Sequence, residues 1–481
     1  MRTAPDVGLG GKLRQFCPIG VAPACRTLGP LSFFAKFIDN PLRVIPQSAY
    51  HENIVHQTNR CGSVAWILDP ALIKDVLVAR SDLFPITGIQ KRVLGPLGGK
   101  GVLTTEGTEW RWQRQTVAPL FRHSELLRYV PAMATAANVM LAEWAADGSA
   151  GYRMIDRDMT RVAFRVIART LLPEANDEVA AAIEQASCDY FKSISWSFAY
   201  SYFGLPRAMP QPGLRKKGRA ERFLRSAVAE LIATSRTNPR RRDDLFNRLS
   251  QARHPETGEC MSSELLLDSL LTFMMVGHES TAKALTWALY LLSQSDGWAE
   301  CVRREVEAAT GTEQIAAKHF DQLQITQQVV KEALRLYPPV PSICRYAARD
   351  VDLGGRKIAA GTLVNIPIYV LHRHRKLWND PENFDPNRFA PANVASISRM
   401  QFLPFGAGPR TCIGSAFATI EATTVLATLI RGARFRLKPG HVPTPISRVT
   451  LGPKGGMPMQ IELRRSLAEP RAPERTVAHT A

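Results

Sequence analysis

The sequence lacks the features that mark several large classes of protein. No stretch reaches about 20 uninterrupted apolar residues, the length that a membrane-spanning helix needs. The amino-terminal residues are positively charged but lack the apolar core of a secretory signal. They are rich in arginine and poor in acids, as transit peptides are, yet proline and glycine interrupt any amphipathic helix there. We therefore expect neither a targeting segment nor a membrane anchor.

Closely spaced cysteines are absent as well. The eight cysteines are scattered singly, with no CxxC pair and no spacing typical of a disulfide framework or a zinc site. Thiols that stay unpaired fit a reducing compartment. We therefore expect a cytoplasmic location.

Acidic residues are scarce relative to basic ones. There are 43 Asp plus Glu against 61 Lys plus Arg, a net charge of +18. This charge suits nucleic acid, an acidic membrane surface or an acidic protein partner. The basic runs at residues 215–219 and 240–242 lack the interleaved aromatic residues of a nucleic-acid signature. We expect no nucleic-acid partner.

The pattern of the chain predicts a mainly α (α+β) fold, with a helix-rich lobe and a smaller β-rich lobe. Helical periodicity dominates residues 120–335, and strand-like segments return at 351–371 and near the carboxyl end. No repeat or long linker divides the sequence. We expect a flexible lead over residues 1–29, a single domain over 30–463 and a disordered tail over 464–481.

A glycine-rich stretch, LGPLGGKG at residues 94–101, superficially looks like a phosphate-binding loop. The GxxxxGK spacing fails, and Gly101 stands where serine or threonine is needed. We therefore reject a nucleotide site here and expect a flexible loop.

The segment PFGAGPRTCIG, residues 404–414, places one cysteine in a loop of small residues ahead of an apolar helical run. Gly406, Gly408 and Gly414 allow sharp turns and close approach to a flat partner. Phe405 is placed to cover the Cys412 sulfur. Because Cys412 stands near a helix amino terminus, we expect a lowered thiol pKa.

A thiolate in this setting has three possible roles: metal ligand, nucleophile or redox thiol. The equally simple alternative is that Cys412 is a small, buried apolar side chain. A nucleophile needs a positioned base, and His372 and His374 carry no signature that places either of them there. A redox thiol needs a second cysteine nearby, which is missing. Axial ligation of haem iron remains, because one thiolate suffices and Arg410 can pair with a haem carboxylate.

The cysteine loop resembles the haem-binding signature FxxGxRxCxG of the cytochromes P450. The residues that match it are Phe405, Gly408, Arg410, Cys412 and Gly414. The resemblance extends over about residues 30–463, in which four further motifs follow in the family's order.

Two of these motifs imply a buried charge network. KEALRLYPP, residues 331–339, resembles the ExxR motif with Glu332 and Arg335, and WNDPENFDPNRF resembles the PxRF segment with Arg388. Alone, the first pair would be a common surface salt bridge. The resemblance implies that the three residues form a structural network that supports the haem loop.

Another motif supplies candidate partners for the haem carboxylates. WRWQR, residues 110–114, resembles the family's WxxxR, with Trp110 and Arg114 one helical turn apart. Arg345 matches a further position where family members carry such an arginine. Taken alone, WRWQR would be an amphipathic helix with solvated arginines.

The stretch 262–294 predicts one long buried helix that begins with a serine cap. Charged residues interrupt every window long enough to span a membrane. Its central GHEST resembles the family's [AG]GxE[TS] groove, in which a glycine admits oxygen and an acid–alcohol pair delivers protons. Glu279 and Ser280 occupy the catalytic positions, and serine replaces the usual threonine. Thr281 is turned about 100° away and cannot face the same point.

Val276 stands where a smaller residue is usual in the family, and it narrows this groove. The motif therefore does not identify the substrate. The resemblance implies contacts from four segments, of which the aromatic one is equally well explained as core. These segments are residues 84–102, 190–203, 340–343 and 455–458.

The resemblance implies a haem-thiolate monooxygenase that carries haem b (heme b, iron protoporphyrin IX). It would insert one atom of O2 into a C–H bond of an apolar small molecule, such as a fatty acid or a terpenoid. We expect a monomer that receives electrons from an acidic ferredoxin or flavodoxin with its reductase. A haem-thiolate isomerase, dehydratase or peroxygenase, and a non-catalytic haem sensor, stay open as alternatives.

Overall fold

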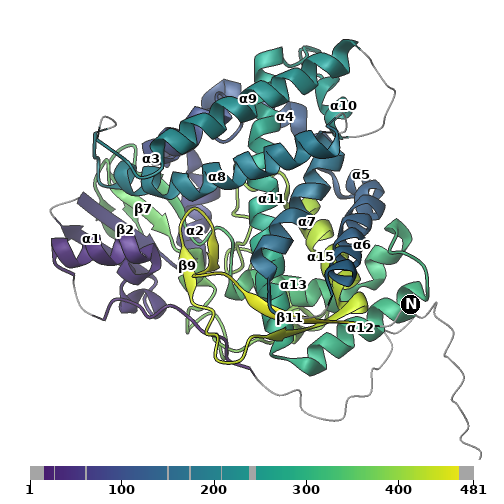
Figure 1. The fold of residues 1–481 in the computed structure, drawn as a ribbon. Helices are drawn as coiled ribbons and strands as arrows, with labels where there is room; N and C mark the ends of the chain where they lie inside the picture. Colours follow the sequence, from purple (N-terminus) through teal and green to yellow (C-terminus); the bar gives the residue numbers. More distant parts are fainter. Residues whose placement is uncertain are drawn as a thin grey trace, which may run out of the picture.

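The computed structural model describes most of the chain. The described residues are 16–25, 28–59, 62–148, 151–172, 175–206, 209–237 and 245–464. Helices dominate these ranges (Figure 1). The α-helices are α1 (Pro30–Asp39), α2 (Pro70–Lys74), α3 (Gly88–Gly98), α4 (Gly107–Val117), α5 (His123–Leu126), α6 (Val130–Asp147), α7 (Ile155–Leu171), α8 (Asp177–Tyr202), α9 (Leu214–Thr237), α10 (Leu245–Ser250), α11 (Ser263–Ser293), α12 (Asp296–Thr310), α13 (Gln324–Leu336), α14 (Ile368–Leu371) and α15 (Ser415–Gly432).

Strands gather in small sheets beside the helices, which confirms the predicted mainly α fold with a smaller β part. In the four-stranded sheet β1-β2-β7-β4, only the pair β2–β7 is parallel. The order β3-β11-β8 forms a second sheet, and β9–β10 and β5–β6 are two-stranded. The strands are β1 (Ile54–Asn59), β2 (Gly62–Ile67), β3 (Arg153–Met154), β4 (Ile343–Tyr346), β5 (Val351–Leu353), β6 (Arg356–Ile358), β7 (Leu363–Ile366), β8 (Ala433–Leu437), β9 (Pro445–Ser447), β10 (Leu451–Pro453) and β11 (Pro458–Leu463).

The long central helix is confirmed as α11. Ser262 caps it, because its Oγ accepts the Leu265 N–H at 3.2 Å. Within the described ranges, no helix combines the length and the apolar character that crossing a bilayer requires. Asp268, His278 and Thr281 are instead buried against protein.

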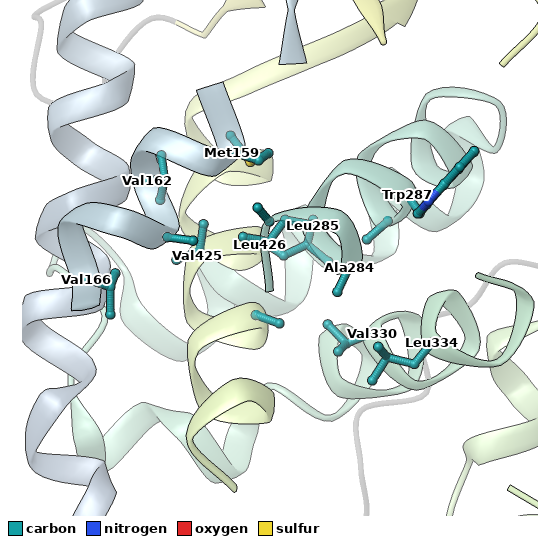
Figure 2. Close-up of a cluster of buried hydrophobic side chains, with 14 of the residues drawn as sticks. Met159, Val162, Val166, Ala284, Leu285, Trp287, Val330, Leu334, Val425 and Leu426 are labelled. Atoms are coloured by element: carbon teal, nitrogen blue, oxygen red, sulfur yellow. The ribbon is translucent and has the colours of Figure 1, made fainter. Parts of the chain in front are cut away.

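The hydrophobic core lies where α7, α11, α13 and α15 meet (Figure 2). Apolar side chains from all four helices point toward one another there. Trp287 of α11 is fully buried, stacks on Tyr337 with ring centroids 3.9 Å apart, and donates its indole N–H to Leu451 O at 2.9 Å. Burial on every side explains why α11 is apolar around most of its circumference. The labelled core residues are Met159, Val162, Val166, Ala284, Leu285, Trp287, Val330, Leu334, Val425 and Leu426.

The predicted flexible lead is wrong for residues 16–25. Phe16 forms a β-bridge with Phe384, and its ring contacts the Tyr290 ring at 5.9 Å between centroids. The Tyr369 hydroxyl accepts the Val21 N–H at 2.9 Å. These contacts with distant residues hold the segment on the body of the protein. Residues 1–15 of the lead, and residues 465–481 of the predicted tail, lie outside the described ranges.

The predicted loop at residues 94–101 is wrong for residues 94–98, because α3 extends through Gly98 and includes Pro96, whereas residues 99–101 follow the helix as a turn. Thr87 caps this helix through the Gln90 N–H at 3.2 Å, and Val93 and Leu97 are buried in the core. Tertiary packing therefore overrides the low helix propensity of glycine and proline.

The aromatic segment 190–203 forms the end of α8 and contributes mainly to core packing. Tyr202 stacks on Phe37 of α1 with ring centroids 4.2 Å apart, and Phe203 contacts Phe34 at 4.8 Å. Phe191 instead turns toward α11, where its ring meets the His278 ring at 5.8 Å. Phe191 thus lies against α11, the helix that carries the predicted groove.

Candidate active site

The cysteine loop is a tight turn held by its own main chain. Cys412 N donates to Phe405 O at 2.9 Å, and Thr411 N donates to Gly408 O at 3.0 Å. Gly408 has a φ of 74°, and a Cβ there would lie 1.9 Å from Leu77 O. Glycine is therefore required at 408 both by backbone conformation and by close approach to residues 75–79.

Gly414 has a different role from the other loop glycines. Its φ of −85° is open to any residue, and it stands at the cap position of α15. A Cβ at Gly414 would meet no atom within 4 Å. The space beside this glycine is therefore free for a flat partner lying along the start of α15.

The Cys412 thiol is accessible to solvent although it lies among interior elements. The predicted lowering of its pKa is wrong for this structure. Burial among protein atoms raises the pKa of the thiol, and this effect outweighs the Gly414 amide and the Arg114 guanidinium, which both lower it. The sulfur is crowded by loop atoms, yet it remains accessible to a ligand. A coordinated metal ion would deprotonate such a thiol outright.

Three arginines gather on one side of this loop. Arg410 lies over the Trp110 ring, 4.4 Å from guanidinium carbon to ring centroid, and donates to Thr105 O at 2.8 Å. Burial lowers the pKa of Arg410 to about 10, and the nearby charges of Arg345 and Arg114 contribute. The structure thus brings together all four residues predicted to contact the haem carboxylates.

The charge of Glu106 acts on Arg345 and Arg410, but this carboxylate is ion-paired with Lys91, so among the described residues the arginine cluster has no ion-paired anion of its own. In the part of the chain that the structure describes, no carboxylate lies within ion-pair distance of Arg114, Arg345 or Arg410. Half-buried cations that repel one another are costly unless an anion joins them. The two carboxylates of haem b would supply it, since guanidinium groups bind carboxylates with matched geometry. The residues present therefore fit this cofactor.

The groove face of α11 carries Val276 and Ser280, four residues apart and thus on one side of the helix. Val276 is 41% exposed, and the Ser280 hydroxyl donates to Val276 O at 2.9 Å. Gly277 does not open this groove as predicted. A Cβ there would point at Ile167 Cδ1, 3.0 Å away, so the glycine lets α11 pack closely on α7.

Glu279 is held away from solvent by two partners. Its carboxylate pairs with Lys283 at 3.3 Å and accepts the Thr450 hydroxyl at 3.1 Å. Burial raises the pKa of Glu279, but Lys283, His278 and Thr450 together lower it below its ordinary value. The carboxylate is therefore ionised at neutral pH and tied to the β9–β10 turn.

Thr281 faces a different environment from Ser280. It is buried, and its hydroxyl donates to Gly277 O at 3.0 Å. Its neighbour on α15 is the fully buried Glu421, whose pKa is raised well above the ordinary value by burial and lowered only in part by Thr281. The sequence indicated that the two hydroxyls point apart, but it missed this protonated carboxyl group behind the groove.

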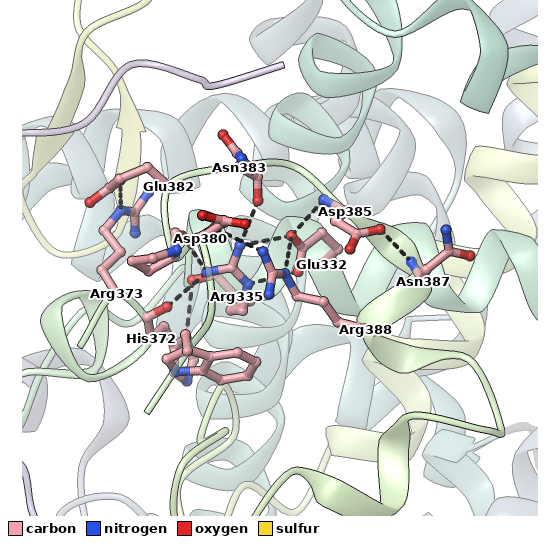
Figure 3. A network of polar contacts seen from close by, with 12 residues as sticks. Glu332, Arg335, His372, Arg373, Asp380, Glu382, Asn383, Asp385, Asn387 and Arg388 are labelled. Atoms are coloured by element: carbon pink, nitrogen blue, oxygen red, sulfur yellow. Dashed lines mark hydrogen bonds and ion pairs between the residues drawn. The ribbon is translucent and has the colours of Figure 1, made fainter. Parts of the chain in front are cut away.

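Glu332 and Arg335 form a fully buried pair (Figure 3). Arg335 donates twice to the Glu332 carboxylate, at 2.7 Å each. It also donates to the main-chain carbonyls of His372 at 2.8 Å, Pro381 at 2.6 Å and Asn383 at 2.9 Å. The pair thus ties α13 to the segment that follows α14.

Arg388 joins this pair more loosely. Its Nε lies 3.6 Å from Glu332 Oε1, and its two terminal nitrogens donate to Asn379 O at 2.6 Å and Asp380 O at 2.8 Å. The structure therefore brings all three predicted network residues together, with Arg335 as the more fully bonded arginine.

His372 links the network to the cysteine loop, a role that the sequence did not reveal. Its Nε2 accepts the Leu403 N–H at 2.9 Å, one residue before the loop, and its Nδ1 lies 3.1 Å from Arg335 O. The ring must therefore be neutral, with its proton on Nδ1. Burial and the adjacent Arg335 lower the pKa of His372 to about 3.

Two predicted substrate segments lie in different settings. Val340 is 44% exposed, and Ile343 Cδ1 lies 3.3 Å from the Cβ position of Gly406, so residues 340–343 border the cysteine loop. The turn at 455–458 packs instead against the start of α7, where Met457 N donates to Asp156 Oδ1 at 2.8 Å. The β9–β10 turn, through Thr450, and β10, through Leu451, are parts of this region that contact α11.

One accessible cysteine in a glycine-shaped loop, ahead of a buried helix and beside unpaired arginines, defines a haem-thiolate protein. The sequence profile of the family Cytochrome P450 matches residues 53–458. The chain belongs to the cytochrome P450 family, whose members carry haem b, which activates O2.

Curated relatives agree with this assignment. The chain is 30% identical to cyclooctat-9-en-7-ol 5-monooxygenase of Streptomyces melanosporofaciens over 83% of its own length and 85% of the relative's. It is 30% identical to cyclooctatin synthase of the same organism, over 86% and 90% of the two lengths. It is also 30% identical to pentalenene oxygenase of Streptomyces avermitilis, over 86% and 91%. The chain is a cytochrome P450 monooxygenase, which acts with O2, a small-molecule substrate and a redox partner.

Because His372 is neutral in the folded protein, the free energy of unfolding should depend on pH. Because the folded state lowers the pKa of His372 from 6.5 to about 3, the unfolded chain binds more protons between these values. The free energy of unfolding should therefore fall by up to about 1.4 kcal/mol per pH unit through this group as pH drops. His372→Gln should flatten the acid limb of a denaturation-midpoint profile, whereas His56→Gln, exposed on β1, should not. An unchanged acid limb in His372→Gln would contradict a neutral, buried imidazole.

Proposed function

We propose that this monooxygenase oxidises an apolar small molecule of fatty-acid or terpenoid type, with terpenoids favoured. The observation that carries this proposal is that two apolar side chains are exposed there: Val276 on the groove face of α11 and Val340 beside the cysteine loop. Two relatives are named for the unsaturated compounds cyclooctat-9-en-7-ol and pentalenene, which supports the same class. Apolar walls with a few placed polar groups are typical of such sites.

A ligand screen tests the substrate class. Purified holoprotein titrated with terpenoids and fatty acids should show the shift of the haem absorption band that accompanies loss of distal water, and it should do so with terpenoids at lower concentration. Charged sugars and nucleotides serve as controls. A shift produced only by the polar compounds would contradict the proposed class.

The proposed roles follow from the positions of the residues. Cys412 would hold the iron from the loop side, and Trp110, Arg114, Arg345 and Arg410 would hold the haem carboxylates. The cofactor, when bound, supplies the activation of O2 and the insertion of one oxygen atom.

The protein's own contribution to the chemistry is proton delivery and exclusion of water. The Ser280 hydroxyl lies on the groove face and donates to Val276 O, so it must first turn away from this carbonyl. Its proton would then pass into the groove while its oxygen accepts a proton from within. Glu279 is ionised and tied to Lys283 and Thr450, so it would relay a proton only after this tie loosens and its carboxylate takes up a proton from the surface. Serine lacks the methyl group that restricts the threonine rotamer, so delivery should be less tightly positioned.

Ser280→Ala should lower coupling several-fold, measured as product formed per reductant consumed, because the groove loses its oriented hydroxyl. Consumption of reductant should continue. Ser293→Ala is a matched control, since this hydroxyl on the same helix also donates to a main-chain carbonyl, Tyr290 O at 2.7 Å, but at the helix end. Equal coupling in Ser280→Ala and the parent protein would rule out the proposed role.

We further infer that electrons come from a separate acidic ferredoxin or flavodoxin, with its reductase, in the cytoplasm. The net charge of +18 favours an acidic partner. Arg111 is exposed on α4, one turn before Arg114, whose charge acts on the Cys412 thiol. Docking on this face would give electrons a short path to the iron. The scattered cysteines support the reducing compartment.

Reduction by an acidic ferredoxin should slow as ionic strength rises, because salt screens charges beyond about 10 Å at 0.1 M. Arg111→Gln should weaken this dependence and reduce the rate at low salt. Lys438→Gln, on an exposed cation at the end of β8, should leave both unchanged. A rate that does not respond to salt would refute electrostatic steering on any face.

A further inference from the structure

Helix α4 carries two candidate haem contacts but buries little apolar surface. Trp110 and Arg114 lie beside Arg410 of the cysteine loop. The buried residues of the helix are Gln113, Thr116 and Val117, of which only Val117 is apolar. Among the described helices and strands, its main close neighbour is the short helix Ala118–Phe121 that follows it directly. Side-chain contacts with loops must therefore contribute to the position of α4.

The segment between α10 and α11 supplies one such contact. It doubles back at residues 253–260, where His254 N donates to Glu259 O at 2.9 Å. The His254 side chain closes this turn as well, because its Nδ1 accepts the N–H groups of Glu256 at 3.3 Å and Thr257 at 3.2 Å. His254 is 5% exposed, so its ring belongs to the interior of the protein.

The same imidazole ring contacts α4. Its Nδ1 accepts two N–H groups, so the ring carries its proton on Nε2. Nε2 therefore donates to Gln115 Oε1, at 3.1 Å. The face of the ring stacks on the Trp112 indole, with an interplanar angle of 0° and the ring centroids 5.5 Å apart. One side chain thus joins the turn to two residues of α4.

Trp112 lies on the opposite side of α4 from the candidate haem contacts. Each residue turns a helix by about 100°, so Trp112 is about 200° away from both Trp110 and Arg114. Arg410 lies over the Trp110 ring at 4.4 Å, whereas His254 stacks on the Trp112 ring. The helix is therefore held from two opposite sides. Rotation of α4 about its axis would displace the haem contacts, and the stack with His254 opposes this rotation.

We propose that His254 is a positioning residue for the partners of the haem carboxylates. Through Trp112 and Gln115 it fixes the rotation of α4. That rotation in turn presents Trp110 and Arg114 to the cofactor. The inference rests on the proposed role of these two residues in holding haem, and it does not depend on the substrate class.

The test measures how fast haem leaves the ferric holoprotein when excess apomyoglobin captures what is released. His254→Asn keeps a side-chain oxygen that can accept the N–H groups of the turn, but it removes the contacts with α4. Haem release should therefore become several-fold faster. Resonance Raman bands of the haem carboxylates should shift in the same variant, which a change confined to the turn would not produce.

Further variants identify the contact through which His254 acts. Trp112→Leu should also speed haem release, and the double variant should release haem no faster than the faster single variant, because both substitutions remove the same stack. Gln115→Leu leaves the turn intact and removes only the hydrogen bond, so it should give a smaller increase.

His319→Asn is a matched control. This histidine is 4% exposed and also accepts a main-chain N–H at Nδ1, from Ala316 at 3.1 Å, but it lies between α12 and α13. Both the rate of haem release and the carboxylate bands should stay at their parent values in this variant. A faster release here would show that loss of any buried histidine turn loosens the cofactor, and it would overturn the specific role of His254.

Arg114→Gln separates this inference from the proposal on which it rests. Faster haem release in Arg114→Gln, together with parent-like release in His254→Asn, would overturn the role of His254 alone. Parent-like release in Arg114→Gln would instead contradict the proposed carboxylate partner. Additive effects in the double variant, or carboxylate bands that do not move in His254→Asn, would also overturn the inference, because they would indicate general loosening of the fold.

Discussion

The site depends above all on the buried pair of Glu332 and Arg335. Neither charge is exposed, so each must be fully bonded for the fold to be stable. Arg335 meets this need by donating to three carbonyls of the segment after α14, and His372 then passes the restraint to Leu403. The start of the cysteine loop is thereby fixed to α13, a helix that carries none of the haem contacts itself. Rigidity of the loop is the condition for holding one sulfur toward a flat cofactor.

Glycine residues add a second constraint, because they let the main chain approach neighbouring elements closely. Gly408 brings the cysteine loop against Leu77 O, and Gly99 brings the end of α3 against Asp268. In both places a positive φ and the lack of a side chain are needed together. Loops at the site are thus ordered by main-chain contact with neighbouring elements, while most helices are ordered by apolar burial.

Much of this arrangement could be predicted from sequence where one pattern repeats over many residues. The periodic apolar run with a serine cap indicated α11 within one residue at each end, and the cysteine motif located the start of α15. The prediction was wrong where glycine or proline suggested a loop, as in α3, because Val93 and Leu97 gain more from burial than the breakers cost. It was also wrong for residues 16–25, where the partners of Phe16 and Val21, Phe384 and Tyr369, lie hundreds of positions away.

The sequence by itself determined the family, the long central helix and the residue types of the candidate site, because these depend on local spacing and on motifs that need particular side chains. Only the tertiary structure decided which atoms meet. It placed Gly277 against Ile167, tied Glu279 to Thr450, made His372 neutral and stacked His254 on Trp112. The physical reason is that burial and charge pairing depend on neighbours far apart in the chain, which spacing along the sequence does not encode.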